Sequence, residues 1–336
     1  MTVFDRLAAV AVAVPFLMGT VAAGSPVEGD VVFRFEDPAI VESSGLVAQD
    51  GLFLTTNDSG DSGRVFAVDP ASGETVGVTR WAAEPVDVEA LAPAGRGEVW
   101  AGDIGDNPGS RSSIEVARVP VGSGERDVTA AAYELTYPGA ARDAETLLAH
   151  PLTGQLYVAS KNVFGGALYA APEQLDEDRP NRLSRLGAVL PIATDGAFFP
   201  DGEHLVLRDY GRAVFYTFPG LEVVGDLDLP DQQQGEGIAV DAEGVVYVSS
   251  EGRRAPVLEV DLPDSLRAMV SAVPESTPSP TTSPVPESGP TDVPGSREDV
   301  ELPQGADTER PVWPWFLTGW LGLGVIVVLL FALRRR

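Results

Sequence analysis

One pattern recurs five times between residues 31 and 262 and constrains the fold more than any other feature of the chain. In each copy a small or acidic residue precedes a short apolar run, and a turn then leads to a second run rich in β-formers. The copies are roughly 40 to 55 residues apart, a period typical of one blade of a β-propeller. They begin at Ser44-Gly45-Leu46, Glu89-Ala90-Leu91, Glu145-Thr146-Leu147, Asp195-Gly196-Ala197 and Glu236-Gly237-Ile238.

Third and fourth β-rich runs follow within the first four copies, and Asp, Gly and Pro separate them as hairpins require. The fifth copy lacks a fourth run, but residues 31–35, upstream of the first copy, supply one. An N-terminal strand that completes the last blade would close the ring and remove open sheet edges. The sequence therefore predicts an all-β, five-bladed β-propeller over residues 26–265. A six-bladed ring would need a repeat hidden between Glu89 and Glu145, and a split β-sandwich is the rival fold.

Two apolar segments flank this domain. Residues 7–23 end in the small residues Val21-Ala22-Ala23, a pattern that predicts a cleaved signal peptide over residues 1–23, with an uncleaved anchor helix as the alternative. Residues 313–333 predict a C-terminal transmembrane helix, because a helix of that length spans roughly 31 Å. The arginines at 334–336 predict a cytoplasmic basic tail.

Residues 272–311 are rich in Pro, Ser and Thr and lack large apolar groups, so they predict an extended stalk. The order of these segments predicts a cell-membrane protein with a single C-terminal span and its domain on the extracytoplasmic side. The membrane is therefore one expected partner.

Composition excludes several classes of function. The chain has no cysteine and only two histidines, which argues against disulfides, thiolate metal sites and polyhistidine zinc sites. A formal net charge of −27 argues against nucleic acid as a partner, because little of this surface would neutralise phosphates. An acidic surface of this kind does suit divalent cations.

The candidate site lies at one mouth of the predicted ring. In a propeller, the loops before the inner strands and the hairpins between second and third strands open on one face. Acids stand ahead of the inner strands, and crowded carboxylates must protonate, pair with arginine or recruit a cation such as Ca²⁺. The expected metal ligands are Glu89, Glu145, Asp195 and Glu236, and the expected ligand-binding residues are Asn57, Asp58, Asp61, Asp103, Asp106, Asn107, Lys161 and Asp209.

Turn formation is the alternative explanation for the acids and asparagines of these hairpins. Asp, Asn and Gly dominate tight turns for conformational reasons alone, so any single hairpin of this set is accounted for as a turn. The recurrence of an acid directly before each apolar inner strand is a stronger signal, because turn chemistry does not demand a carboxylate there.

The strings Glu42-Ser43-Ser44-Gly45-Leu46 and Gly102-Asp103-Ile104-Gly105-Asp106-Asn107 resemble a group of exported actinobacterial β-propeller proteins of undefined activity. The acid-headed inner strands are more distantly similar to those of NHL-type and gluconolactonase-type propellers. The lactonase resemblance implies that a glutamate, asparagines and an aspartate hold a divalent metal that polarises a lactone. Glu236 or Glu89 would be that glutamate, but no clear asparagine set follows in this chain.

These observations predict a membrane-tethered binding module that engages an extracellular protein or a small-molecule ligand through its acidic face. The alternative is a metal-dependent hydrolase of a lactone or phosphoester, with Glu89, Glu145 and Asp195 as ligands or general base. A purely structural spacer is a third interpretation.

Overall fold

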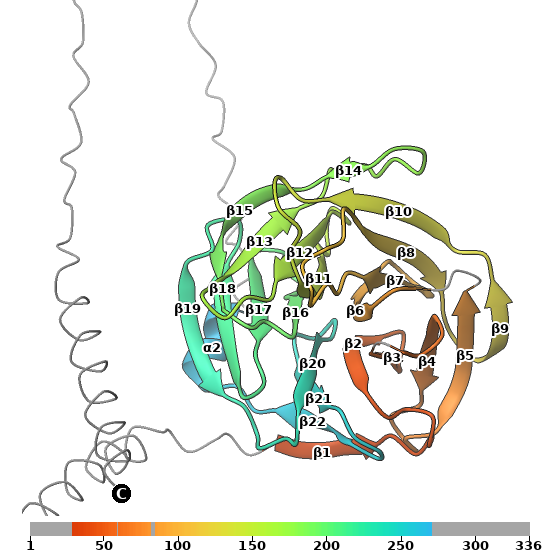
Figure 1. The fold of residues 1–336 in the computed structure, drawn as a ribbon. Coiled ribbons are helices and arrows are strands. Elements are labelled where there is room, and N and C mark those ends of the chain that lie inside the picture. The colour runs from red at the N-terminus through yellow and green to blue at the C-terminus, as the bar shows by residue number, and fades with distance from the viewer. Residues whose placement is uncertain (1–28, 59, 82–84, 271–336) are drawn as a thin grey trace, which may run out of the picture. The chain divides into compact units, whose positions relative to one another are not determined.

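The computed structural model describes residues 29–58, 60–81 and 85–270, which form five sheets arranged in a ring (Figure 1). One strand of each sheet lies at the centre, and each of these inner strands contacts the inner strands of the two neighbouring sheets. The inner strands are β2 (Ser43–Gln49), β6 (Val88–Pro93), β11 (Ala144–Ala149), β16 (Asp195–Phe198) and β20 (Gly235–Val240). The predicted five-bladed β-propeller is confirmed.

Three more antiparallel strands follow outward in each blade, at or close to the predicted β-rich runs. The second strands are β3 (Leu52–Asn57), β7 (Glu98–Asp103), β12 (Leu156–Ser160), β17 (His204–Arg208) and β21 (Val246–Ser250). The third are β4 (Arg64–Val68), β8 (Ile114–Pro120), β13 (Gly166–Ala170), β18 (Arg212–Thr217) and β22 (Pro256–Val260). The outer strands are β5 (Thr75–Trp81), β10 (Ala131–Thr136), β15 (Ser184–Val189), β19 (Val223–Asp228) and β1 (Gly29–Arg34).

The N-terminal strand β1 closes the ring. It pairs antiparallel with β22, with Gly29 opposite Val260 and Arg34 opposite Pro256, so the first and the last strand of the described chain lie side by side in Figure 1. Phe33 of this strand packs edge-on against Phe53 of blade 1, with ring centroids 5.1 Å apart. The predicted completion of the last blade by an N-terminal strand is confirmed.

Two short strands that the repeat pattern did not predict extend the outer edges. β9 (Gly124–Val128) leaves blade 2 to pair parallel with β5 of blade 1, and β14 (Asn181–Arg182) leaves blade 3 to pair parallel with β10 of blade 2. The long interval between Glu89 and Glu145 contains β9 and not a further blade, so a sixth blade is not present there. Covering an outer strand removes an exposed edge that would otherwise pair with other chains.

The core lies between the blades. Adjacent residues of an inner strand point to opposite sides, so Leu46 packs toward blade 5 while Val47 packs toward blade 2. The inner strands crowd the axis: a Cβ atom on Gly45 would lie 2.3 Å from the backbone nitrogen of Leu91. One on Gly237 would lie 2.8 Å from Leu46 Cβ. This crowding explains why glycine follows the small or acidic first residue in several copies.

The short helix α2 (Asp264–Val270) follows the last blade and was not predicted, since the expected domain ended at residue 265. Leu266 and Val270 of α2 are buried in the cluster that contains Leu227 and Leu229. The helix therefore covers β19 at the periphery of blade 4.

The described residues all belong to one compact unit of the chain. The predicted signal peptide, stalk, transmembrane helix and basic tail all lie outside the described residues. Within the described part, no helix has both the length and the apolar character needed to cross a membrane.

Candidate functional site

One face of the ring gathers the predicted site residues. Because the blades are antiparallel, the start of each inner strand pairs with the end of the second strand, as in the pairs Ser43–Asn57, Val88–Asp103 and Asp195–Arg208. The loops before the inner strands and the hairpins between second and third strands therefore open on the same side. We call this side the top face.

Three carboxylates from two neighbouring blades converge on the top face. Asp58 follows β3 of blade 1, whereas Asp87 and Glu89 lie at the start of β6 in blade 2. One oxygen of each lies within 4.8 Å of one oxygen of the other two. Glu89 is buried, and Oδ1 of half-buried Asp87 is buried with no hydrogen-bond partner among the described residues. We call Asp58, Asp87 and Glu89 the acid cluster.

The Gly102–Asn107 string builds the wall of this cluster. The Asp103 carboxylate accepts hydrogen bonds from the backbone N–H groups of Val86 and Asp87, both at 2.9 Å. Arg111 donates to Asp103 Oδ1 at 2.7 Å and holds that carboxylate in place. A Cβ atom on Gly105 would lie 2.3 Å from Asp87 Oδ2, so only glycine leaves room for the carboxylate. Asp103 and Gly105 therefore position the cluster without belonging to it.

Two carboxyl groups of the cluster have raised pKa values. Burial, helped by the negative charges of Asp58, Glu145 and Asp87, raises the pKa of Glu89 to about 10, while the charge of Lys161 opposes the shift. The pKa of Asp87 is also raised, first by burial and then by Asp58. Carboxylates this close to one another favour a bound cation or a retained proton.

Glu145 is placed beside the cluster but has its own partner. Lys161 donates to Glu145 Oε1 and, at 3.0 Å, to the hydroxyl of Tyr210. Burial would lower the pKa of Lys161, but these two hydrogen bonds raise it, so the ammonium stays charged. Burial raises the pKa of Glu145 to about 8 despite the ion pair. Glu145 Oε2 is buried without a hydrogen-bond partner among the described residues.

Asp195 is fully buried and engaged with backbone. Its oxygens accept hydrogen bonds from the N–H groups of Gly196 at 2.8 Å, Ile238 at 2.9 Å and Leu46 at 3.3 Å. The last two belong to β20 and β2, so this carboxylate ties three inner strands together. Burial raises its pKa well above the ordinary value, although these hydrogen bonds and Arg208 oppose the shift.

Glu236 is buried at the start of β20. Its Oε1 accepts a hydrogen bond from Gln234 Nε2 at 3.1 Å, and the same amide donates to Glu251 at 2.6 Å. Burial raises the pKa of Glu236 to about 7, with Gln234 and Lys161 opposing. Of the four predicted metal ligands, Glu89 alone lies in the acid cluster.

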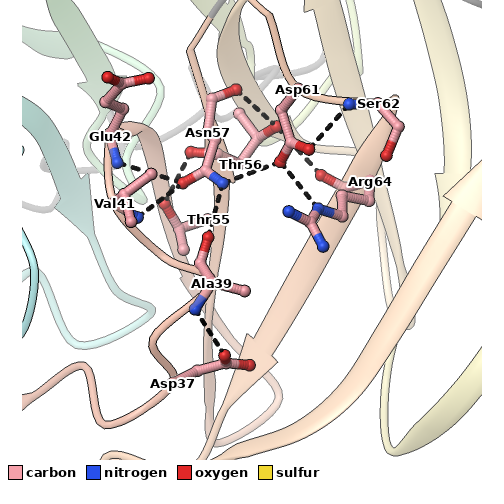
Figure 2. A network of polar contacts seen from close by, with 10 residues as sticks. All are labelled: Asp37, Ala39, Val41, Glu42, Thr55, Thr56, Asn57, Asp61, Ser62 and Arg64. Atoms are coloured by element: carbon pink, nitrogen blue, oxygen red, sulfur yellow. Dashed lines mark hydrogen bonds and ion pairs between the residues drawn. The ribbon is translucent and has the colours of Figure 1, made fainter.

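Figure 2 shows that Asn57 and Asp61 form hydrogen bonds with residues of the surrounding loops. Asn57 accepts the N–H of Glu42 at 3.2 Å, and its Nδ2 donates to Ala39 O and to Asp61 Oδ2, both at 2.8 Å. The same Asp61 oxygen accepts Arg64 Nε at 2.7 Å. These side chains fix the approach to β2 and hold the hairpin that carries Asp58.

Of the remaining predicted ligand-binding residues, Asp106 and Asp209 stabilise turns and Asn107 is exposed. Asp106 accepts two backbone N–H groups of its own loop at 2.9 Å each, and Asp209 accepts two of its hairpin at 2.8 and 3.0 Å. Asn107 is exposed. The sequence analysis did not predict Asp87 as a ligand. The position of this acid, two residues before Glu89, was the signal that could have identified it.

Arg208 is a fully buried arginine between blades 4 and 5. It donates to the carbonyls of Gly237 at 3.0 Å, Ser249 at 3.2 Å and Tyr210 at 3.1 Å. Burial lowers its pKa to about 10. These bonds engage the guanidinium with the protein, so it does not neutralise the acid cluster.

A cavity of about 590 Å³ lies toward the other end of the ring, lined by the ends of the inner strands and by the turns that follow them. Its lining is mostly apolar. Two polar side chains that line it are paired, because Arg118 bonds Glu98 at 2.6 Å and His150 Nε2 lies 3.0 Å from the carbonyl of Gly202.

The ring of five sheets defines the chain as a five-bladed β-propeller protein. No family model and no curated protein matches the sequence. Solved structures with a similar fold include glutaminyl cyclase from Myxococcus xanthus, at 15% identity and a TM-score of 0.45, covering 71% of this chain and 100% of that one. A glucose dehydrogenase has 11% identity and a TM-score of 0.44, covering 70% and 100%. Streptogramin B lyase has 12% identity and a TM-score of 0.39, covering 70% and 97%. At sequence identities and TM-scores this low, the likeness assigns none of these proteins' activities to this chain.

Proposed function

We propose that the protein is an exported binding module, tethered to the membrane by its C-terminal end, that engages a positively charged ligand or partner group through its acidic top face. The acid cluster is the observation that carries this proposal. Gathering three carboxylates, one buried and two half-buried, within 4.8 Å of one another is not needed to hold the blades together, because apolar interfaces already do so.

Ca²⁺ is the free ion whose ligand preference fits this cluster. Calcium takes six to eight oxygen ligands, and carboxylates bind it through one or both oxygens. Asp58, Asp87 and Glu89 offer up to six, while the nearby Glu145 is occupied by Lys161. The absence of cysteine and the scarcity of histidine disfavour zinc and copper.

A metal-dependent hydrolase of a lactone or phosphoester is the second candidate. The observation that favours it is the pair of protonatable acids on the same face as the cluster, Glu145 and Glu236, whose raised pKa values of about 8 and 7 suit a general base. A bound cation would polarise the substrate carbonyl or phosphoryl oxygen, and one of these glutamates would activate water.

Calcium-dependent thermal stability of the full-length protein tests the binding proposal. An ion that binds only the native state stabilises it by about 2.7 kcal/mol at a hundredfold excess over its dissociation constant. We expect calcium to raise the melting temperature relative to chelator, Glu89→Gln to abolish the rise, and the exposed control Glu203→Gln to keep it. Equal melting temperatures in calcium and chelator would contradict the cation site.

A further inference from the structure

The cavity toward the end of the ring opposite the acid cluster is large enough to hold a small molecule. Its volume of about 590 Å³ lies within the range of ligand pockets and far exceeds the voids of packed protein interiors. All five inner strands contribute to its wall, together with the turns that follow them. The apolar residues that these strands supply include Leu46, Leu91, Leu147, Ala197 and Ala239.

The cavity narrows toward the top face, because the inner strands crowd the axis there. A Cβ atom on Gly45 would lie 2.3 Å from the backbone nitrogen of Leu91, and one on Gly237 would lie 2.8 Å from Leu46 Cβ. Leu46 and Leu91 both line the cavity, so this crowding marks its inner end. The turns after the inner strands form the other end, where Leu152 lines the cavity and is 73% exposed. A ligand that enters past Leu152 therefore meets an apolar inner end.

The ionisable and amide side chains of the wall have partners within the protein. They are Gln49, Arg118, His150 and Asp241. Gln49 Nε2 donates to the carbonyl of Glu98 at 2.9 Å, and Arg118 Nη2 donates to the Glu98 carboxylate at 2.6 Å. Asp241 accepts the backbone N–H of Val245 at 2.9 Å, and His150 contacts a carbonyl as described above. A charged ligand would lose its water here without gaining a counter-charge, so the wall favours an uncharged one.

The dimensions of the cavity favour a compact molecule. The stretch of β2 that lines it, Leu46–Gln49, rises about 10 Å, so the volume corresponds to a mean cross-section of about 60 Å². A cavity about as wide as it is deep fits linked or fused rings better than one extended hydrocarbon chain. An apolar cavity of about 150 Å³ holds one benzene ring, so this one has room for two or three rings. Trp100 and Phe198 add aromatic surface to the wall, on which such rings can pack.

We propose that this cavity binds a compact, uncharged, apolar small molecule of two or three rings. The ligand enters at the turns that follow the inner strands and covers the exposed side chain of Leu152. Its affinity comes from removing its own apolar surface and that of the wall from water. The cavity shares no residue with the acid cluster, so the inference goes beyond the proposed function and does not depend on it.

Benzophenone, an uncharged two-ring molecule that attaches to nearby C–H bonds under ultraviolet light, is the probe. The full-length protein is titrated with it in chelator and irradiated, and mass spectrometry maps the labelled positions. We expect saturable labelling concentrated in residues 46–49, 91–95, 147–154, 196–200 and 239–242. The anionic counterpart 4-benzoylbenzoate should label these stretches at least tenfold less at equal concentration.

Ala197→Leu enlarges a side chain of the cavity wall and should lower the labelling at least tenfold. Ala71→Leu is the matched control, since Ala71 is exposed and does not line the cavity. If Ala197→Leu does not fold, Leu152→Ser takes its place and should raise the half-saturating concentration at least fivefold. Leu186→Ser, at an exposed position of the same blade outside the cavity, should leave that concentration unchanged.

Four results would overturn the site. They are labelling that does not saturate or that concentrates outside the five stretches, equal labelling by 4-benzoylbenzoate, unchanged labelling of folded Ala197→Leu, and labelling that falls as the protein concentration rises. The last would show that a second copy of the chain covers the mouth of the cavity. None of these results bears on the calcium-dependent melting temperature, and the absence of a calcium effect would leave this labelling unaffected.

Discussion

Gly105→Ala tests whether the acid cluster works through its geometry. The new Cβ atom would stand 2.3 Å from Asp87 Oδ2, 2.5 Å from Asp87 Cγ and 2.9 Å from Glu89 Cγ. Ordinary carbon contacts begin at about 3.4 Å, so the Asp87 carboxylate must move by about 1 Å. Calcium–oxygen distances span only about 2.3–2.6 Å, and such a displacement removes Asp87 from any shared cation. The substitution itself removes no charge.

The expected loss of calcium affinity is about 10- to 100-fold, which is typical when a residue that positions a metal ligand is changed. That loss corresponds to about 1.4–2.7 kcal/mol of binding free energy. Isothermal titration with calcium measures it, and the melting temperature in chelator reports any separate loss of stability. Gly211→Ala is the matched control, because a Cβ there meets no atom within 4 Å and the residue also lies on a top-face hairpin.

Full calcium affinity in Gly105→Ala would refute the reasoning, since the cation would then not depend on the position of Asp87. If Gly105→Ala does not fold, Asp87→Asn takes its place, because it keeps the side-chain volume and removes only the charge. Retained affinity in Asp87→Asn would count equally against the cluster.

Two further predictions follow from the pKa values and the order of segments. Burial raises the pKa of Glu236 from 4.5 to about 7 and that of Glu145 to about 8, so the folded state binds these protons more tightly than the unfolded state. In chelator, the free energy of unfolding should therefore fall as pH rises from 5 to 9, by on the order of 3 kcal/mol for Glu236 alone. Urea denaturation at the two pH values measures this change, and equal or higher stability at pH 9 would contradict the prediction. Protease added to intact cells should release the propeller by cutting within residues 273–311, and a domain protected until lysis would show the predicted orientation to be wrong.

Local sequence pattern determined the fold of this chain. Alternating apolar residues and turn residues identify strands from a few neighbours at a time, and the repeat period groups those strands into blades. The missing fourth run of the last copy and the run at residues 31–35 sufficed to predict that β1 closes the ring. The strands β9 and β14 and the helix α2 were not predicted, because they are short and their pairing or packing partners lie in other blades.

Only the tertiary structure decided which acids meet. Every predicted ligand stands at the start of an inner strand or in a hairpin, and sequence position alone makes them equivalent. The ring brings Asp58 of blade 1 against Asp87 and Glu89 of blade 2, while it directs Asp195 onto the backbone N–H groups of Leu46 and Ile238. The physical reason is that a carboxylate's role depends on which donors and charges surround it, and here those come from blades distant in the chain.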